Sequence, residues 1–137
     1  SNLAPMVAQQ VLQLSRRHGV LVIEDDADSR TALVTLLNAW GCEVRSAEDV
    51  TSASQRLAEG FQPEAVIADL RLAGGASGIE AVHAVRSTLG NALPALLITG
   101  DVGEAQTQRA QEADLRLLAK PVKPMQLRAF LGQTFGT

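Results

Sequence analysis

The stretch AVIAD, Ala65–Asp69, decides the fold, because four consecutive apolar residues end in an aspartate. A short apolar run of this kind is typical of a strand that is buried on both faces. Comparable runs lie along the rest of the chain, at 20–24, 43–46, Ala95–Thr99 and 115–119. The runs at 65–69, 95–99 and 115–119 are nearly continuous in apolar residues, and we expect them to be the central strands.

Helical patterns separate these runs. In the first, leucines and Trp40 recur at three- and four-residue spacings, and we expect Trp40 to lie in the core. Asp28 is the expected N-cap of this helix, and Gly41 is its expected end. Further helical patterns cover 50–59, 79–89 and 104–113, and a last one follows Pro124. The alternation of strands and helices predicts a parallel sheet with helices on both faces.

The composition is that of one globular domain. The chain has 137 residues, 46% of them hydrophobic, which suffices for a single core. Lysine and arginine number 12 against 15 aspartates and glutamates, without a basic run, which argues against direct contact with nucleic acid or a membrane. Cys42 is the single cysteine and no signal-peptide pattern occurs, so we expect a reducing, cytoplasmic location.

Residues 1–19 precede the repeating pattern. We interpret them as a linker or leader segment, with a helix that packs on a partner as the alternative, and expect the folded domain at 20–137. His18 and His83 belong to no cluster of ligand-type residues, so we expect both to be solvated. Cys42 has no basic neighbour that would activate it, and it is expected to be a packing residue.

Polar side chains end most of the expected strands. Glu24 and Asp25 end the first strand, Asp69 ends the third, Thr99 ends the fourth, and Lys120 follows the fifth. Ligands of an open parallel sheet bind beyond the carboxyl ends of its strands, so these side chains are expected to meet at one edge. Each of them alone has an ordinary explanation as a cap, a strand residue or a solvated charge. Their joint placement is what indicates a site.

Three carboxylates in one place require a cation. Two unit charges about 4 Å apart repel by roughly 4 kcal/mol at an effective dielectric of about 20. Mg²⁺ prefers oxygen ligands, and the strand ends carry no thiol or imidazole of the kind that zinc prefers. Beside Mg²⁺, Asp69 is the candidate nucleophile toward a phosphoryl donor. Thr99 and Lys120 are the candidate partners of the transferred oxygens.

The segment from about residue 19 to 135 resembles the receiver domain of bacterial response regulators. The matching features are the acidic pair Glu24-Asp25 after Val22-Ile23, the acceptor strand Ala65–Asp69, the stretch 96–99 that ends in the switch hydroxyl, and the pair Lys120-Pro121. As in the family, the Lys120-Pro121 bond is expected to be cis. The resemblance implies an α/β, flavodoxin-like fold: a doubly wound sheet of five parallel strands in the order 2-1-3-4-5, with helices on both faces.

The resemblance also assigns roles at the site. Asp25 and Asp69 are expected to bind Mg²⁺ directly, together with the backbone carbonyl of Arg71, and Glu24 is expected to act through a bound water. Asp69 would take its phosphoryl group from the phosphohistidine of a histidine kinase or of a histidine phosphotransfer domain. The domain would then catalyse its own aspartyl phosphorylation and dephosphorylation.

Two departures from the family pattern favour a relay over a conventional switch. Leu117 stands three residues before Lys120, where family members usually carry Tyr or Phe as an aromatic switch. The loop 70–78 resembles that of receivers fused to hybrid sensor histidine kinases, which pass the phosphoryl group on or serve as its sink. We therefore expect a phosphorelay receiver that is part of a hybrid sensor histidine kinase.

Arg71 and Asp101 follow the acceptor and the switch hydroxyl by two residues each. In the family that this segment resembles, these two positions flank the mouth of the site and influence how fast the acyl phosphate hydrolyses, and we expect Arg71 and Asp101 to pair across that mouth.

The alternative function is that of a pseudo-receiver, which keeps the fold as a phosphorylation-independent protein-binding module. The missing aromatic at Leu117 supports it, whereas the complete set of polar strand ends speaks against it. A phosphatase acting on soluble esters would normally carry a second aspartate where this chain has Arg71.

Overall fold

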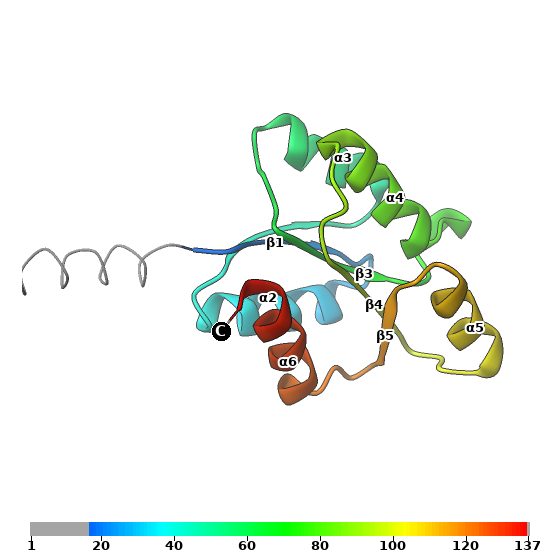
Figure 1. Cartoon of the computed structure of the whole chain (residues 1–137). Helices are drawn as coiled ribbons and strands as arrows, with labels where there is room; N and C mark the ends of the chain where they lie inside the picture. Colours follow the sequence, from blue (N-terminus) through cyan, green and yellow to red (C-terminus); the bar gives the residue numbers. More distant parts are fainter. Residues whose placement is uncertain (1–16, 137) are drawn as a thin grey trace, which may run out of the picture.

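The structure is a computed structural model, and it describes residues 17–136. Strands and helices alternate along them (Figure 1): β1 (Gly19–Ile23), α2 (Ala27–Ala39), β2 (Glu43–Ala47), α3 (Val50–Ala58), β3 (Ala65–Asp69), the 3₁₀ turn η1 (Ala73–Gly75), α4 (Gly78–Leu89), β4 (Ala95–Thr99), α5 (Glu104–Glu112), β5 (Arg116–Ala119) and α6 (Pro124–Phe135). Of the expected leader 1–19, residues 1–16 lie outside the described part. Within residues 17–136, no helix is long and apolar enough to cross a bilayer.

The strands form one parallel sheet in the order β2-β1-β3-β4-β5. Val22 of β1 lies opposite Ser46 of β2 on one side and opposite Ile67 of β3 on the other. Because the chain winds outward in both directions from β1 and β3, the crevice for a ligand lies at the carboxyl ends of these two strands. The predicted flavodoxin-like fold is confirmed.

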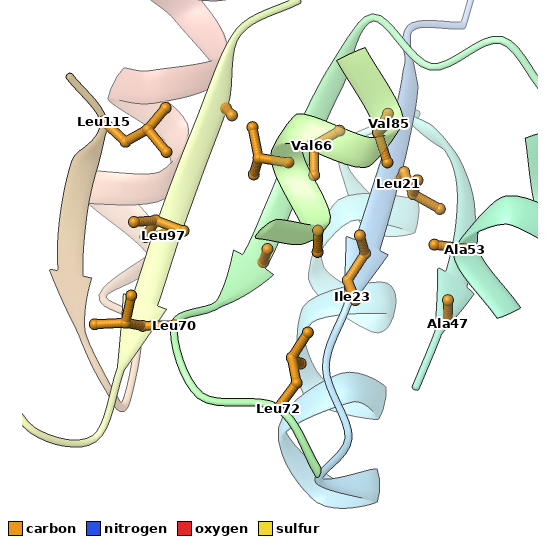
Figure 2. Close-up of a cluster of buried hydrophobic side chains, with 14 of the residues drawn as sticks. Leu21, Ile23, Ala47, Ala53, Val66, Leu70, Leu72, Val85, Leu97 and Leu115 are labelled. Carbon is orange, nitrogen blue, oxygen red and sulfur yellow. The ribbon is translucent and has the colours of Figure 1, made fainter. Parts of the chain in front are cut away.

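Alternate strand residues point to opposite faces of the sheet, and helices cover both faces. On one face, α3, α4 and α5 cover a cluster that includes Leu21, Val66 and Leu97, and Figure 2 shows Val85 of α4 near Leu21 and Val66. On the other face, α2 and α6 pack on residues such as Ile67. Each buried side chain of this size contributes about 1.5–3 kcal/mol to stability. The core therefore holds the carboxyl ends of β1, β3 and β4 in fixed register.

The fifth strand differs from its prediction. Its apolar run predicted a central strand, but β5 pairs with β4 alone and lies at the edge of the sheet. Leu117 and Leu118 are half-buried against opposite faces, whereas Arg116 and Ala119 are exposed. An apolar run reports that helices cover both faces of a strand, and an edge strand can have such cover as well.

The start of α2 differs from its prediction, whereas its end agrees, because Trp40 is the C-cap and Gly41 follows with a φ of 84°. Asp26, not Asp28, is the N-cap: its backbone is extended and its Oδ2 accepts a hydrogen bond from Ser29 N at 2.8 Å. Asp28 lies in the first turn, where a negative charge favours the helix N-terminus. Trp40 is half-buried at the rim of the core, and the guanidinium of Arg128 lies 5.8 Å from its ring centroid.

The prediction of a solvated His18 was wrong. Nδ1 of His18 lies 2.6 Å from Oε2 of Glu64, and the ring stacks on Phe135 with centroids 4.1 Å apart. The fold brings the end of α6 beside the residue that precedes β1, a contact that no local pattern reveals. His83 is exposed and Cys42 is buried, as predicted, and burial raises the pKa of the Cys42 thiol.

Candidate metal and phosphoacceptor site

The carboxyl ends of β1 and β3 bring three carboxylates together. Glu24 and Asp25 follow β1, Asp69 ends β3, and one carboxylate oxygen of each lies within 4.8 Å of the others. Glu24 and Asp69 are buried, whereas Asp25 is exposed. The cluster is therefore anchored in the core and open to solvent on the side of Asp25.

Both oxygens of Asp69 are held by hydrogen bonds. Oδ1 accepts from the backbone N–H of Arg71 at 3.0 Å, and Oδ2 accepts from Nζ of Lys120 at 2.6 Å. A charge-assisted hydrogen bond of this length is among the stronger polar contacts in proteins. The carboxylate of Asp69 is thus fixed in orientation at the end of a fully buried strand.

Glu24 is the most deeply buried of the three acids. Its Oε1 accepts from the backbone N–H of Asp26 at 3.0 Å. Its Oε2 lies 2.8 Å from Nζ of Lys120 as an ion pair, without the angles of a hydrogen bond. Burial raises the pKa of Glu24 to about 7, against the opposing effects of Lys120 and of the Asp26 N–H.

Lys120 is the cation of the site. Burial disfavours its charged form, but the hydrogen bond to Asp69 and the proximity of Glu24 outweigh burial, so the pKa of Lys120 is raised. The residue keeps its charge at neutral pH. The Lys120–Pro121 bond is cis, as predicted, and the backbone N–H of Lys120 donates to the carbonyl of Thr99 at 2.8 Å.

The residues present fit a divalent cation with oxygen ligands. Three carboxylates face one ammonium group, so the cluster retains an excess of negative charge when its acids are ionised. Oε2 of Glu24 is buried and accepts no hydrogen bond with good geometry, and its charge is offset only by Nζ of Lys120, 2.8 Å away, which pairs with Asp69 as well. Asp25 leaves the site accessible from solvent. All of these side-chain donors are hard oxygens, which Mg²⁺ prefers.

Arg30 supports the loop that carries the acidic pair. Its Nη1 donates to the backbone carbonyl of Glu24 at 2.9 Å and to that of Asp25 at 3.3 Å, while Asp26 caps the helix that follows. We did not identify Arg30 from the sequence, because an arginine in the second turn of an amphipathic helix carries no signal for a contact to a preceding loop.

Thr99 and Asp101 form a turn at the end of β4. The Thr99 hydroxyl donates to the carbonyl of Asp101 at 3.0 Å and accepts from its N–H at 3.1 Å. Nη2 of Arg71 lies 3.4 Å from Oδ2 of Asp101, so the predicted pair between these two residues is confirmed. Thr99 is buried, whereas both members of the pair are largely exposed.

Gly78, at the start of α4, permits a close approach that the sequence did not reveal. A Cβ at this position would overlap the backbone carbonyl of Asp69. The N–H of Gly78 donates to the carbonyl of Leu70 at 2.9 Å, and Ser77 caps α4 by accepting from Ile79 N. The loop after β3 is therefore drawn against the acceptor strand, and only glycine leaves space for this path.

Residues 20–131 match the family model described as the response regulator receiver domain. The chain belongs to the response regulator receiver family. Receivers of this family generally bind Mg²⁺ at an acidic cluster and accept phosphoryl groups from histidine kinases. The position of Glu24, Asp25 and Asp69 agrees with such a cluster.

Individual relatives of this receiver are similar along most of its length. The phosphate regulon transcriptional regulatory protein PhoB of Escherichia coli (strain K12) is 31% identical over 112 residues, which are 80% of this chain and 48% of PhoB. The receiver thus spans about half the length of the curated relatives that it matches.

Solved structures have the same fold as this receiver. A putative response regulator from Chloroflexus aurantiacus is 28% identical with a TM-score of 0.77, covering 89% of this chain and 100% of its own. The PhyR receiver domain of Erythrobacter litoralis is 28% identical with a TM-score of 0.72, covering 87% of this chain and 90% of its own. The chemotaxis protein CheY4 of Vibrio cholerae is 25% identical with a TM-score of 0.75, covering 87% and 99% respectively.

Proposed function

We propose that this receiver takes a phosphoryl group from the phosphohistidine of a histidine kinase or a histidine phosphotransfer domain onto Asp69, with Mg²⁺. The observation that carries the proposal is the setting of Asp69. One of its oxygens accepts from a backbone N–H, the other accepts from Lys120, and two further carboxylates lie beside it. This arrangement places a nucleophile, a cation-binding cluster and a fixed positive charge at one point.

In the proposed transfer, a carboxylate oxygen of Asp69 attacks phosphorus. The new P–O bond forms as the P–N bond to the donor imidazole breaks, and the imidazole nitrogen leaves with the electron pair. Nζ of Lys120 turns from Asp69 Oδ2 toward a phosphoryl oxygen as a point charge. The hydroxyl of Thr99 donates a hydrogen bond to another phosphoryl oxygen.

The proposed metal ligands are the side chains of Asp25 and Asp69 and the backbone carbonyl of Arg71, with Glu24 acting through a water. When bound, Mg²⁺ would screen the negative charge of the incoming phosphoryl group. Burial of Glu24 and the contact of Arg30 with the loop carbonyls support this assignment, because they hold the acidic pair in place.

We place the receiver domain at 20–137, in the cytoplasm and without direct contact to nucleic acid or membrane; of the expected leader, Gly19 begins β1 and His18 stacks on Phe135, so these two residues belong to the fold. As its context we propose a hybrid sensor histidine kinase. Leu117 supports this context, since a half-buried leucine cannot make the aromatic switch of a conventional regulator. A kinase domain in the same polypeptide would support the hybrid context, and a DNA-binding helix-turn-helix would contradict it.

Phosphorylation by acetyl phosphate with Mg²⁺, measured by mass spectrometry of the intact protein, tests the proposal. We expect one phosphoryl group on the wild type, none on Asp69→Asn, and none when EDTA removes the metal. Asp114→Asn, an exposed aspartate beyond the other end of α5, is the matched control and should be modified like the wild type. Equal incorporation in Asp69→Asn would refute Asp69 as the acceptor.

The pseudo-receiver is the second candidate, and Leu117 is the observation that favours it. It predicts that the wild type incorporates nothing under the same conditions and also with a cognate kinase, while still binding its partner. The two candidates therefore give opposite results in one assay.

A further inference from the structure

Asp101 connects the candidate site to α5. Its Oδ2 lies 3.4 Å from Nη2 of Arg71 and accepts a hydrogen bond from Nε2 of Gln106 at 3.3 Å. Its Oδ1 accepts from the N–H of Gly103 at 2.9 Å. The loop between β4 and α5 is thereby tied to the helix on one side and to the loop after Asp69 on the other.

Thr99 holds the same loop through its hydroxyl. Oγ1 donates its proton to the carbonyl of Asp101 and accepts from the N–H of the same residue. A hydroxyl has one proton to donate. When Thr99 gives this proton to an oxygen of a phosphoryl group on Asp69, its bond to the Asp101 carbonyl is lost. Loading of Asp69, by which we mean its phosphorylation or the binding of a phosphoryl mimic, therefore removes a restraint on Asp101.

Gln106 is the point where α5 receives this change. The residue is 8% exposed, although most of α5 is polar and exposed. Its amide donates to Asp101 Oδ2, and a buried amide left without its partner is costly. Gln106 is therefore expected to follow Asp101 when the loop moves.

We propose that Asp101 and Gln106 transmit the loading of Asp69 to α5, in place of the aromatic relay that this chain lacks. The proposal rests on the proposed function. Gln106 is a positioning residue, because it acts on the site only through Asp101. Leu117 is aliphatic, so it offers no ring that could move into the space beside Thr99.

Hydrogen exchange of the α5 amides tests this relay in the full chain. Loading uses Mg²⁺ with beryllium fluoride, a mimic of the aspartyl phosphate, and fluorine NMR of the bound mimic measures it separately. Gln106→Met removes the amide donor at similar volume. Gln108→Met is the matched control, because Gln108 is an exposed glutamine of the same helix. Asp101→Ala breaks the same link at an exposed loop position, in case Gln106→Met does not fold.

We expect loading to change exchange in α5 several-fold in the wild type and in Gln108→Met, and to leave it unchanged in Gln106→Met and Asp101→Ala. Gln106→Met itself should bind the mimic like the wild type. The relay is refuted if α5 responds equally in both glutamine variants, or if the loaded wild type shows no response in α5. A wild type that does not bind the mimic contradicts the proposed function and removes the relay with it.

Discussion

Glu24 combines complete burial with an ionisable side chain. Its pKa is about 7 in the folded chain, compared with an ordinary value of 4.5. Between these two values the folded state binds more protons than the unfolded state. The stabilisation from protonated Glu24 is therefore fully present below about pH 4.5, and it is lost as the pH rises through about 7.

Replacement of Glu24 by glutamine is expected to remove this pH dependence. Without metal, the wild type should lose stability, relative to Glu24→Gln, between about pH 5 and about pH 8. Urea unfolding in EDTA at both pH values measures the difference. Because glutamine has the same size and cannot ionise, the variant is its own packing control. Parallel pH profiles for the two proteins would show that Glu24 does not titrate in this range.

Gly78 is expected to tolerate no side chain. A Cβ would overlap the carbonyl of Asp69, so Gly78→Ala must displace either α4 or the acceptor strand. Overpacking of this kind costs about 1–3 kcal/mol. Gly100→Ala is the matched control, because a Cβ there meets no atom within 4 Å, and its effect should stay within about 0.5 kcal/mol. Urea midpoints that shift equally in both variants would contradict the steric account.

At the scale of elements, the site is built from loops that follow buried strands. The loops after β3 and β4 meet at the pair of Arg71 and Asp101, whose side chains are 63% and 55% exposed. An exposed ion pair contributes only about 0–1 kcal/mol to stability. The pair therefore adds little to the stability of the fold, and we expect its effect at the approach to Asp69.

Loss of the Arg71 side chain is expected to shorten the lifetime of the phosphorylated protein several-fold, because water reaches the acyl phosphate more freely. The decay of the phosphorylated mass after removal of acetyl phosphate gives the rate. Arg109→Ala, an exposed position on α5, serves as the control and should decay like the wild type. An unchanged lifetime in Arg71→Ala would exclude a gating role for the pair.

At the scale of the whole molecule, the candidate site and the contact between the first strand and the last helix lie at different places on the sheet. The carboxyl ends of the strands carry the candidate site, while the ends of the domain meet elsewhere, where His18 stacks on Phe135 and contacts Glu64. In Figure 1 the end of α6 lies near the start of β1. This contact joins the first strand to the last helix.

A double-mutant cycle on His18 and Phe135 is expected to give a coupling energy of about 0.5–1.5 kcal/mol, the usual range for a stacked aromatic pair. The free energy of unfolding is measured in urea for His18→Ala, Phe135→Ala and the double variant. His83→Ala, at an exposed position on α4, should leave stability almost unchanged. Strictly additive effects of the two substitutions would mean that the stack contributes nothing.

Much of the fold could be predicted from the sequence. Uninterrupted apolar runs such as AVIAD predict strands that are covered on both faces. The polar residues that end these runs predict a candidate site at the carboxyl ends of the strands. Asp69, Thr99 and Lys120 could therefore be predicted from the sequence as candidate site residues, since their positions follow from local pattern and topology. The pairing of Arg71 with Asp101 was predicted from the family resemblance, which places both positions at the mouth of the site, and it is confirmed.

The tertiary structure decided what depends on contacts between distant segments. It placed β5 at the edge, gave the N-cap of α2 to Asp26, and paired His18 with Phe135. It also brought Arg30 onto the loop carbonyls and Gly78 against Asp69. Hydrophobic periodicity records whether a residue is covered, and it does not record which residue covers it. The sequence by itself determined the strands and the polar residues that end them, while the place of β5, the pairing of the site residues and the pKa of Glu24 required the folded chain.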